Sequence, residues 1–146
     1  MSQKWFGRIP DHWKSIPLKY LFRFTGGGTP SRSQSDYWNG DIPWVSPKDM
    51  KSSDIEDAEE HITQQGLESS STSLVSEGSI LIVARSGILK RTIPVAIASR
   101  PVAINQDIRA LIPTRDDFDV RFIQLVIQGY RDTLLNLWRS KGATVE

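Results

Sequence analysis

Apolar and polar residues alternate along positions 18–24, close to the start of the printed sequence. Successive side chains of a β-strand point to opposite faces, so a period of two residues predicts a half-buried strand. Its apolar face would carry Leu18, Tyr20, Phe22 and Phe24, and its polar face Lys19 and Arg23.

Four further strands are predicted by short extended or apolar runs, at residues 42–46, 79–84, 92–98 and 107–112. The first run is held between Pro43 and Pro47, and the second is a continuous apolar stretch that follows a Glu77-Gly78 turn, as is typical of a buried strand. The serine-rich tract 69–73 predicts a flexible connection without a function of its own.

From Asp116 onward the apolar period lengthens to three and four residues, which predicts an amphipathic helix. Its first turn would hold Asp116, Asp117 and Asp119, where the helix dipole favours carboxylates, and its last turn Arg139 and Lys141 before a terminating Gly142. We expect its apolar stripe to pack on the domain's own sheet, with a contact to another domain or protein as the alternative. The stripe comprises Phe122, Ile123, Val126, Ile127, Tyr130, Leu134, Leu137 and Trp138.

The composition indicates a single domain. The chain has 146 residues, of which 38% are hydrophobic, and this is enough to bury one core. A run of eighteen apolar residues and a secretory signal are both missing, so we expect a cytoplasmic protein with no membrane partner. The absence of cysteine excludes disulfides, thiolate nucleophiles and cysteine-ligated metals. The ending at 142–146 has no polar tail, so we expect the chain to be cut from something longer.

Charge is distributed unevenly, although the formal net charge is only +1. Residues 54–60 hold acids alone, and residues 79–109 hold five bases against Asp107. If the fold places these stretches on different faces, one face would form a positive footprint for phosphates; otherwise both are ordinary solvated charges. The acids are Asp54, Glu56, Asp57, Glu59 and Glu60, and the bases are Arg85, Lys90, Arg91, Arg100 and Arg109.

A methyltransferase site has one matching motif. Residues 24–28 (Phe-Thr-Gly-Gly-Gly) follow the F-x-G-x-G pattern that cradles S-adenosylmethionine. The next residues, 29–35, do not favour the helix that this mechanism requires, and the Asn/Asp-Pro-Pro-aromatic tetrapeptide that positions a target amino group is missing. A lone glycine match is weak support for a cofactor site.

Other catalytic signatures are similarly incomplete. Pro10-Asp11 together with Asp49-Met50-Lys51 loosely matches a nuclease pattern in which carboxylates bind a metal and lysine polarises the nucleophile. His12 and His61 lie in turn-like surroundings without a Gly-x-Ser-x-Gly elbow, and no phosphate-binding P-loop is present. We therefore predict no catalytic residue, no metal and no cofactor for this chain.

Polar and aromatic residues gather in residues 26–50, which favours a surface for binding another polymer. Arg32 and Lys48 bracket the aromatic residues, and they could donate to phosphates or guanine edges. Ser31, Ser33 and Gln34 would add adaptable donors and acceptors, and Gly26, Gly27 and Gly28 would let the backbone approach a duplex. The aromatic residues are Tyr37, Trp38 and Trp44, and the alternative is that the two tryptophans belong to the core or anchor the loop.

A second candidate surface follows the buried strand 79–84. Arg85, Ser86, Lys90 and Arg91 lie in the turn that leaves it. Asn105 and Gln106 precede another strand, and both amides could pair bidentately with adenine. As isolated residues they would be ordinary turn formers.

The sequence resembles the target recognition domains of type I restriction-modification specificity (S) subunits. The resemblance rests mainly on the long motif in residues 27–32 and 37–50, with supporting segments at 13–21, 78–87, 105–113 and 142–146. The long motif reads Gly-Gly-Thr-Pro-Ser-Arg and then Tyr-Trp-Asn-Gly-Asp-Ile-Pro-Trp-Val-Ser-Pro-Lys-Asp-Met.

The resemblance implies an α+β fold like that of DNA methylase specificity domains, with a twisted β-rich body and a C-terminal helix. It also implies a non-catalytic protein that reads one half of a bipartite site in double-stranded DNA, with methyltransferase and restriction subunits as partners that do the chemistry. Residues 1–146 would form one recognition domain, the first of a longer subunit whose spacer helices are missing. The expected DNA contacts are Arg32, Lys48, Arg85, Ser86, Lys90 and Arg91, followed by Thr29, Ser31, Asn105 and Gln106.

Two alternatives from other functional classes stay open. One is a nuclease or methyltransferase in its own right. The other is a protein-interaction module that docks a partner through its C-terminal helix, with the basic loops incidental to its function.

Overall fold

Two stacked β-sheets form the body of the protein, in a computed structural model that describes residues 16–86, 92–131, 133 and 136. The first sheet has the strand order β1-β9-β6-β7-β3 and the second the order β4-β2-β8-β5. The strands are β1 (Phe22–Thr25), β2 (Trp38–Val45), β3 (Asp54–Ile55), β4 (Glu60–Ile62), β5 (Leu74–Val75), β6 (Ile80–Val83), β7 (Val95–Ala98), β8 (Val102–Ile104) and β9 (Ile108–Pro113). The helices are α2 (Gln64–Glu68) and α3 (Val120–Gly129), with 3-10 turns η1 (Leu18–Tyr20), η2 (Ser35–Tyr37) and η3 (Pro47–Asp49).

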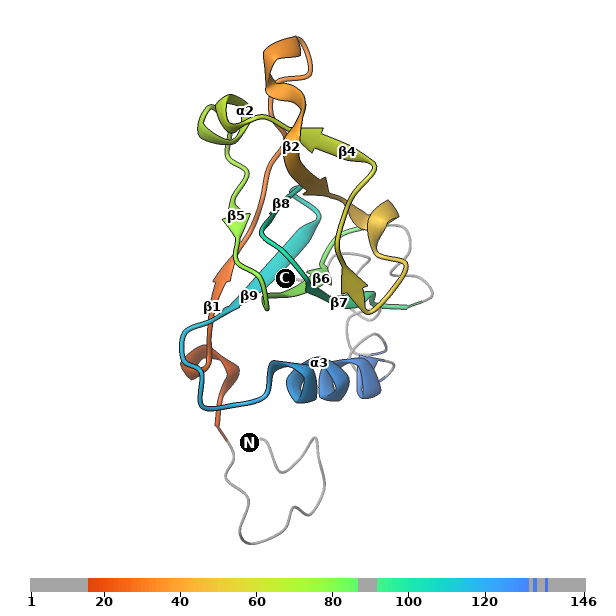
Figure 1. Ribbon diagram of the computed structural model, residues 1–146. Coiled ribbons are helices and arrows are strands. Elements are labelled where there is room, and N and C mark those ends of the chain that lie inside the picture. The colour runs from red at the N-terminus through yellow and green to blue at the C-terminus, as the bar shows by residue number, and fades with distance from the viewer. Residues whose placement is uncertain (1–15, 87–91, 132, 134–135, 137–146) are drawn as a thin grey trace, which may run out of the picture.

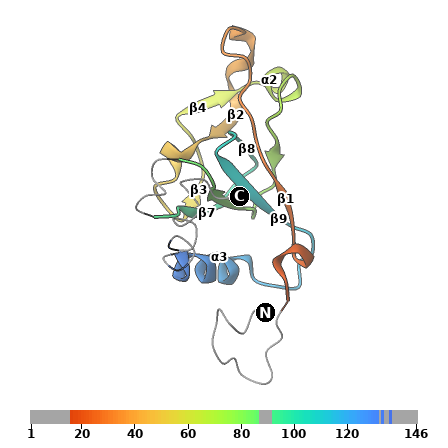
Figure 2. The same cartoon turned by 180° about the vertical axis from the view of Figure 1, so that it is seen from behind.

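Three layers follow one another through the molecule (Figure 1). The second sheet lies on one side of the first, and α3 lies on the other side; Figure 2 shows the same order from behind. Burial agrees with this arrangement, because all four residues of β7 are buried and a strand covered on both faces needs apolar side chains throughout. The main core contains side chains from both sheets, among them Phe22, Leu81 and Ile97 from the first and Val45, Val75 and Ile104 from the second.

The second sheet is apolar on both faces. Val45 packs into the main core, whereas its neighbour Trp44 packs on the outer face with Ile62 and Ala103. Half-buried Trp38, Ile42 and Leu67 complete this smaller outer cluster. Because adjacent residues of a strand point to opposite faces, the Trp44-Val45 pair ties β2 to both clusters.

Three of the predicted strands are confirmed. β6, β7 and β9 fall on the apolar runs 79–84, 92–98 and 107–112, and antiparallel pairing places β6 between β7 and β9. The predicted strand 42–46 is also present, but β2 starts earlier, at Trp38. A register shift in its pairing with β4 lies at residues 39–41, where Asn39 has a positive φ of 62°.

The predicted strand at residues 18–24 is wrong in its first half and in its face. Leu18–Tyr20 form the 3-10 turn η1, and only Phe22–Thr25 are extended. The side chains of Leu18, Tyr20 and Phe24 are exposed, and only Phe22 of the predicted apolar face is buried, where it meets Phe118 edge-to-face. β1 is the edge strand of its sheet, with β9 as its neighbour, so Phe24 lacks a second neighbouring strand that would help to cover it.

The C-terminal helix begins later than predicted. Asp119 is its N-cap and accepts from the backbone N–H groups of Arg121 and Phe122, so Asp116 and Asp117 precede the helix. Val120, Ile123 and Ile127 pack against the main core, which confirms that the stripe covers the domain's own sheet. Phe122 was wrongly included, because its side chain is exposed. The predicted stripe residues Leu134, Leu137 and Trp138 and the terminal Arg139, Lys141 and Gly142 lie outside the described residues.

The serine tract 69–73 is not the flexible connection that was predicted. Thr72 is buried and its hydroxyl donates to the Ile104 carbonyl at 2.7 Å, and Ser73 Oγ lies 3.4 Å from Thr25 Oγ1. The tract therefore closes the space between β8 and the end of β1. Among the described residues, no helix is long and apolar enough to cross a membrane.

Candidate nucleic-acid interface

The glycines after β1 allow the chain to run directly against the turn between β8 and β9. A Cβ at Gly27 would overlap the Ile104 carbonyl oxygen and lie 2.5 Å from that of Asn105. Gly28 is buried beside Ser71, and its N–H donates to the Ile104 carbonyl at 3.2 Å. These glycines were expected to let DNA approach, but their close neighbours in the structure belong to the protein itself, namely backbone atoms of the β8–β9 turn at Gly27 and Ser71 at Gly28.

This approach brings Thr29 to Gln106. The Thr29 hydroxyl donates to Gln106 Oε1 at 2.7 Å, and both residues are exposed. Asn105 is buried and its Oδ1 accepts from the N–H of Asp107 at 2.9 Å. Asn105 thus has the turn-forming role that was the alternative to base pairing, whereas Gln106 faces outward.

Arg85 extends from the end of β6 beside the same turn. The N–H groups of Ala84 and Arg85 both donate to the Asp107 carbonyl, at 2.8 and 3.2 Å, and Arg85 Nε lies 3.7 Å from Asp107 Oδ1. The Arg85 side chain is 57% exposed, so this long ion pair leaves its guanidinium accessible. Five of the predicted contacts therefore gather at one place, which we call the turn cluster: Thr29, Arg85, Ser86, Asn105 and Gln106.

Lys90 and Arg91, the other two predicted contacts after β6, lie outside the described residues, as do Pro10, Asp11 and His12.

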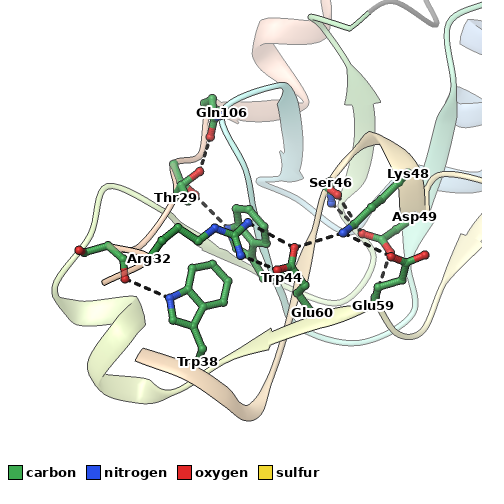
Figure 3. Close-up of polar contacts among 12 residues, drawn as sticks. Thr29, Arg32, Trp38, Trp44, Ser46, Lys48, Asp49, Glu59, Glu60 and Gln106 are labelled. Carbon is green, nitrogen blue, oxygen red and sulfur yellow. Dashed lines mark hydrogen bonds and ion pairs between the residues drawn. The ribbon is translucent and has the colours of Figure 1, made fainter. Parts of the chain in front are cut away.

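Arg32 lies over a pair of tryptophans beside the turn cluster (Figure 3). Its guanidinium carbon is 4.1 Å from the ring centroid of Trp38 and 5.1 Å from that of Trp44. The two rings meet edge-to-face at 5.3 Å, and their indole N–H groups donate to the Ser31 and Gly28 carbonyls, both at 3.0 Å. Trp44 is buried, so the alternative role of core and loop anchor is confirmed for it.

Glu60 holds both cations that were predicted to meet DNA here. Arg32 donates to it through Nη1 at 2.5 Å and Nη2 at 3.4 Å, and Lys48 Nζ lies 3.2 Å from it and 3.3 Å from Glu59. The hydrogen bond from Arg32 lowers the pKa of Glu60, and that from Lys48 lowers it further, while partial burial opposes them. The pKa of Lys48 is raised by its hydrogen bonds to Glu60 and then to Glu59. We call Arg32, Trp38, Lys48, Glu59 and Glu60 the Arg32 clasp.

The turn that carries Lys48 is built by its neighbours. Asp49 Oδ2 accepts from the N–H and hydroxyl of Ser46, which forms a capping box around η3, and Asp49 Oδ1 accepts from the N–H of Glu59 at 3.0 Å. Asp49 was a candidate metal ligand, but both of its carboxylate oxygens are engaged in holding this turn. No group of side chains suited to a metal ion occurs in the described part of the chain.

The remaining polar residues of the loop mainly bond within it. Ser31 Oγ lies 2.9 Å from Ser33 Oγ, and the backbone N–H of Gln34 donates to the Ser31 carbonyl at 3.3 Å. Tyr37 is half-buried, and its carbonyl accepts from Thr63 at 2.9 Å. Ser31 and Gln34 are both exposed beside Arg32.

The acidic and basic stretches do not separate cleanly onto two faces. Arg100 donates to the Asp41 carbonyl at 3.3 Å and contributes to lowering the pKa of Asp57, after a larger effect from His61. Asp54 is paired with Arg121 of α3. The roles of Glu59 and Glu60 were missed because the sequence shows them only as members of an acidic run.

The comparisons with known proteins agree with one another. Residues 10–141 match the family model described as "Type I restriction modification DNA specificity domain". The EcoR124I/EcoR124II specificity subunit of Escherichia coli is 37% identical over 134 residues, which cover 91% of this chain and 32% of that protein. The MjaIX specificity subunit of Methanocaldococcus jannaschii is 36% identical over 110 residues, which cover 73% and 24%. This chain thus spans a third or less of the length of these relatives.

Two solved structures have the same fold. One belongs to work on complex assembly and conformational transition of the type I R-M system, with a TM-score of 0.65, and the other is the HsdS subunit from Thermoanaerobacter tengcongensis, with a TM-score of 0.61. Each is 17% identical and covers 88% of this chain and 30% of the other. At this identity the likeness supports the fold, and it confirms the α+β class.

Proposed function

Because this chain belongs to the family of type I restriction-modification DNA specificity domains, we propose that it binds double-stranded DNA and reads one half of a bipartite target sequence. The turn cluster carries this proposal. An exposed arginine and an exposed glutamine project there from the ends of paired strands, and these two side-chain types make bidentate contacts with guanine and adenine.

The residues that hold the turn cluster in place favour sequence-specific recognition over non-specific DNA binding. Gly27 packs on the β8–β9 turn, and Asp107 is bonded to the end of β6, so side chains from three strand ends are held in one arrangement. Sites on rigid elements position contacts more accurately than sites on long loops. Gln106 accepts from Thr29 through Oε1, which orients its Nε2 donors for an acceptor on DNA.

The chain would act as one recognition domain of a longer specificity subunit, the amino-terminal one, joined to its counterpart by spacer helices. It is proposed to be non-catalytic and to work in the cytoplasm, with methylation and cleavage carried out by methyltransferase and restriction subunits. The length of the relatives supports this division, since they are at least three times as long as the matched segment. The ten predicted DNA contacts remain part of the proposal.

Selection from a random-sequence duplex pool at low salt tests the proposal. The domain is used within a full-length specificity subunit assembled with its methyltransferase subunits, since a half-site held by one domain binds weakly. We expect a short motif to be enriched, and Arg85→Ala and Gln106→Ala each to relax one position of it.

Arg115→Ala is the matched control. Arg115 is an exposed arginine that pairs with Asp117 in the segment leading to α3, so its loss removes the same charge far from the turn cluster along the chain. It should leave the motif unchanged. Failure of the assembled wild-type complex to enrich any motif would contradict the proposed function.

A further inference from the structure

The Arg32 clasp is electrically balanced, although it contains two of the cations expected to bind phosphates. Arg32 and Lys48 supply two positive charges, and Glu59 and Glu60 supply two negative ones. Arg32 contacts Glu60, and Lys48 contacts both carboxylates, with N–O distances of 3.4 Å or less. A phosphate that approached Arg32 or Lys48 would meet the carboxylates as well. The clasp therefore lacks the uncompensated positive charge on which counterion release and non-specific DNA binding depend.

The clasp also fixes one orientation of the Arg32 guanidinium. Glu60 takes a donor from each of Nη1 and Nη2, and the ring of Trp38 supports one planar face. The Arg32 side chain is nevertheless 57% exposed. An arginine held by a carboxylate and an aromatic ring loses less side-chain freedom on forming new hydrogen bonds, and its planar donors match the paired acceptors of a guanine edge.

Its place in the fold puts the clasp next to the turn cluster. Arg32 and Thr29 belong to the same loop, which Trp44 anchors through the Gly28 carbonyl, and Figure 3 shows Thr29 with Gln106 on one side of Arg32 and Lys48 on the other. A DNA surface in contact with Gln106 would thus come near the clasp.

We propose that Glu60 is a specificity-determining positioning residue, which withholds Arg32 and Lys48 from phosphates and presents Arg32 to a base edge. The inference rests on the proposed function and deepens it. Base edges carry no net charge, so a balanced ion pair can approach them without the repulsion that it would impose on a phosphate. Glu60 is the member to test, because it contacts both cations, whereas Glu59 reaches only Lys48.

The main experiment replaces the Glu60 carboxylate by a neutral group of the same shape. In the assembled complex, Glu60→Gln should bind random duplex about tenfold more tightly at low salt, and the slope of log affinity against log salt should steepen by about 1 for the released Arg32, since Glu59 still pairs with Lys48. Discrimination between the selected motif and random duplex should fall. A residue with a merely structural role would weaken both kinds of binding together.

Glu56→Gln is the matched control, because it removes the same charge from the same acidic stretch, and no described residue forms an ion pair with Glu56. It should change the salt slope much less than Glu60→Gln. Thermal melting of both variants checks that they fold. Unchanged or weaker binding of Glu60→Gln to random duplex would overturn the inference.

The salt slope of a second variant, Lys48→Gln, tests the inference without depending on whether the Glu60 variant folds. If Glu60 masks Lys48, the wild-type salt slope contains no contribution from Lys48, and the variant should keep that slope. A slope reduced by about 1 would show that Lys48 binds a phosphate and would overturn the inference. These experiments distinguish failure of the proposed function from failure of the role of Glu60. A wild-type complex that selects no motif contradicts the proposed function. A complex that selects a motif, but whose salt slope is unchanged by Glu60→Gln, contradicts the role of Glu60 alone.

Discussion

Gly27 occupies a position where any side chain would collide with backbone. A Cβ there would meet two carbonyl oxygens of the β8–β9 turn, which cannot move aside as the end of a flexible side chain could. We expect Gly27→Ala to lower the free energy of unfolding by about 2 kcal/mol or more, as forced overpacking does. Urea denaturation followed by circular dichroism measures the change.

Gly129 serves as the comparison for that variant. It is the last residue of α3 and is exposed, and apart from its chain neighbours and its own helix backbone, no described residue has an atom within 4 Å of where a Cβ would be placed. Gly129→Ala should leave stability unchanged or raise it by about 0.5 kcal/mol, because alanine restricts the unfolded chain more than glycine does. Equal losses in both variants would show that the contact at Gly27 is not the cause.

The Arg32 clasp gives stability a dependence on pH. The pKa of Glu60 lies below its ordinary value of 4.5, so the folded protein binds the proton less tightly than the unfolded chain does. The resulting stabilisation is complete above about pH 4.5 and is lost as pH falls through the lowered pKa. Glu60→Gln should therefore lose less stability than the wild type over this acidic range, as measured by melting temperature against pH. Parallel curves for the two proteins would contradict this.

Single residues show what the sequence could reveal about the site. Trp44 could be assigned to the core from its size and its place in an apolar run. The contact between Arg32 and Glu60 could not be predicted from the sequence, because the two residues are distant along the chain. The bulge in β2 and the pairing of β2 with β4 bring them together. The burial of Asn105 is similarly a consequence of the turn between two paired strands.

Helix α3 begins at Val120 because the carboxylate of its N-cap, Asp119, satisfies N–H groups that have no partner within the helix. Asp119→Ala should lower the free energy of unfolding by about 1 kcal/mol. Asp119→Asn should keep most of this stabilisation, since asparagine also caps helices well. Asp116→Ala is the control, because Asp116 is exposed and lies before the cap. Chemical denaturation of the three variants distinguishes the cap from a general loss of negative charge.

Elements differed in how well their patterns predicted them. The apolar runs of β6, β7 and β9 are long enough to stand out, and all three are strands in the first sheet. β3, β5 and β8 have only two or three residues, which is too short to show a hydrophobic period. They are strands because they pair with neighbouring strands, which the sequence does not reveal. The alternation at residues 18–24 misled because an edge strand can expose side chains that a central strand would bury.

The two sheets share one core, which makes the whole molecule a single cooperative unit. Ile104 of β8 is buried in the core that the first sheet also lines. Ile104→Ala should cost about 2 to 5 kcal/mol through the cavity that it leaves. Amide hydrogen exchange should show the same loss of protection in β2 and in β6. Loss confined to β2 would mean that the second sheet opens independently.

At the scale of the molecule, the sequence predicted an α+β protein and its family but not its charge distribution. The family resemblance implied the α+β class, and the change of period from strands to helix agreed with it. The sequence could not predict which charges lie on which face of the molecule. Arg100 and Asp54 each contact a residue of an element that lies far away in the sequence.

The pairing of β1 with β9 has a consequence for how the protein is made. Thr25 pairs with Ala110 across this ladder, so β1, the earliest of the described strands to be synthesised, cannot pair until β9, the latest of them, has been made. Until then one edge of β6 also lacks the strand with which it pairs. The growing chain therefore presents the unpaired edges of β1 and β6 until β9 has been made, and long-range strand pairing of this kind forms slowly and leaves such edges open to aggregation.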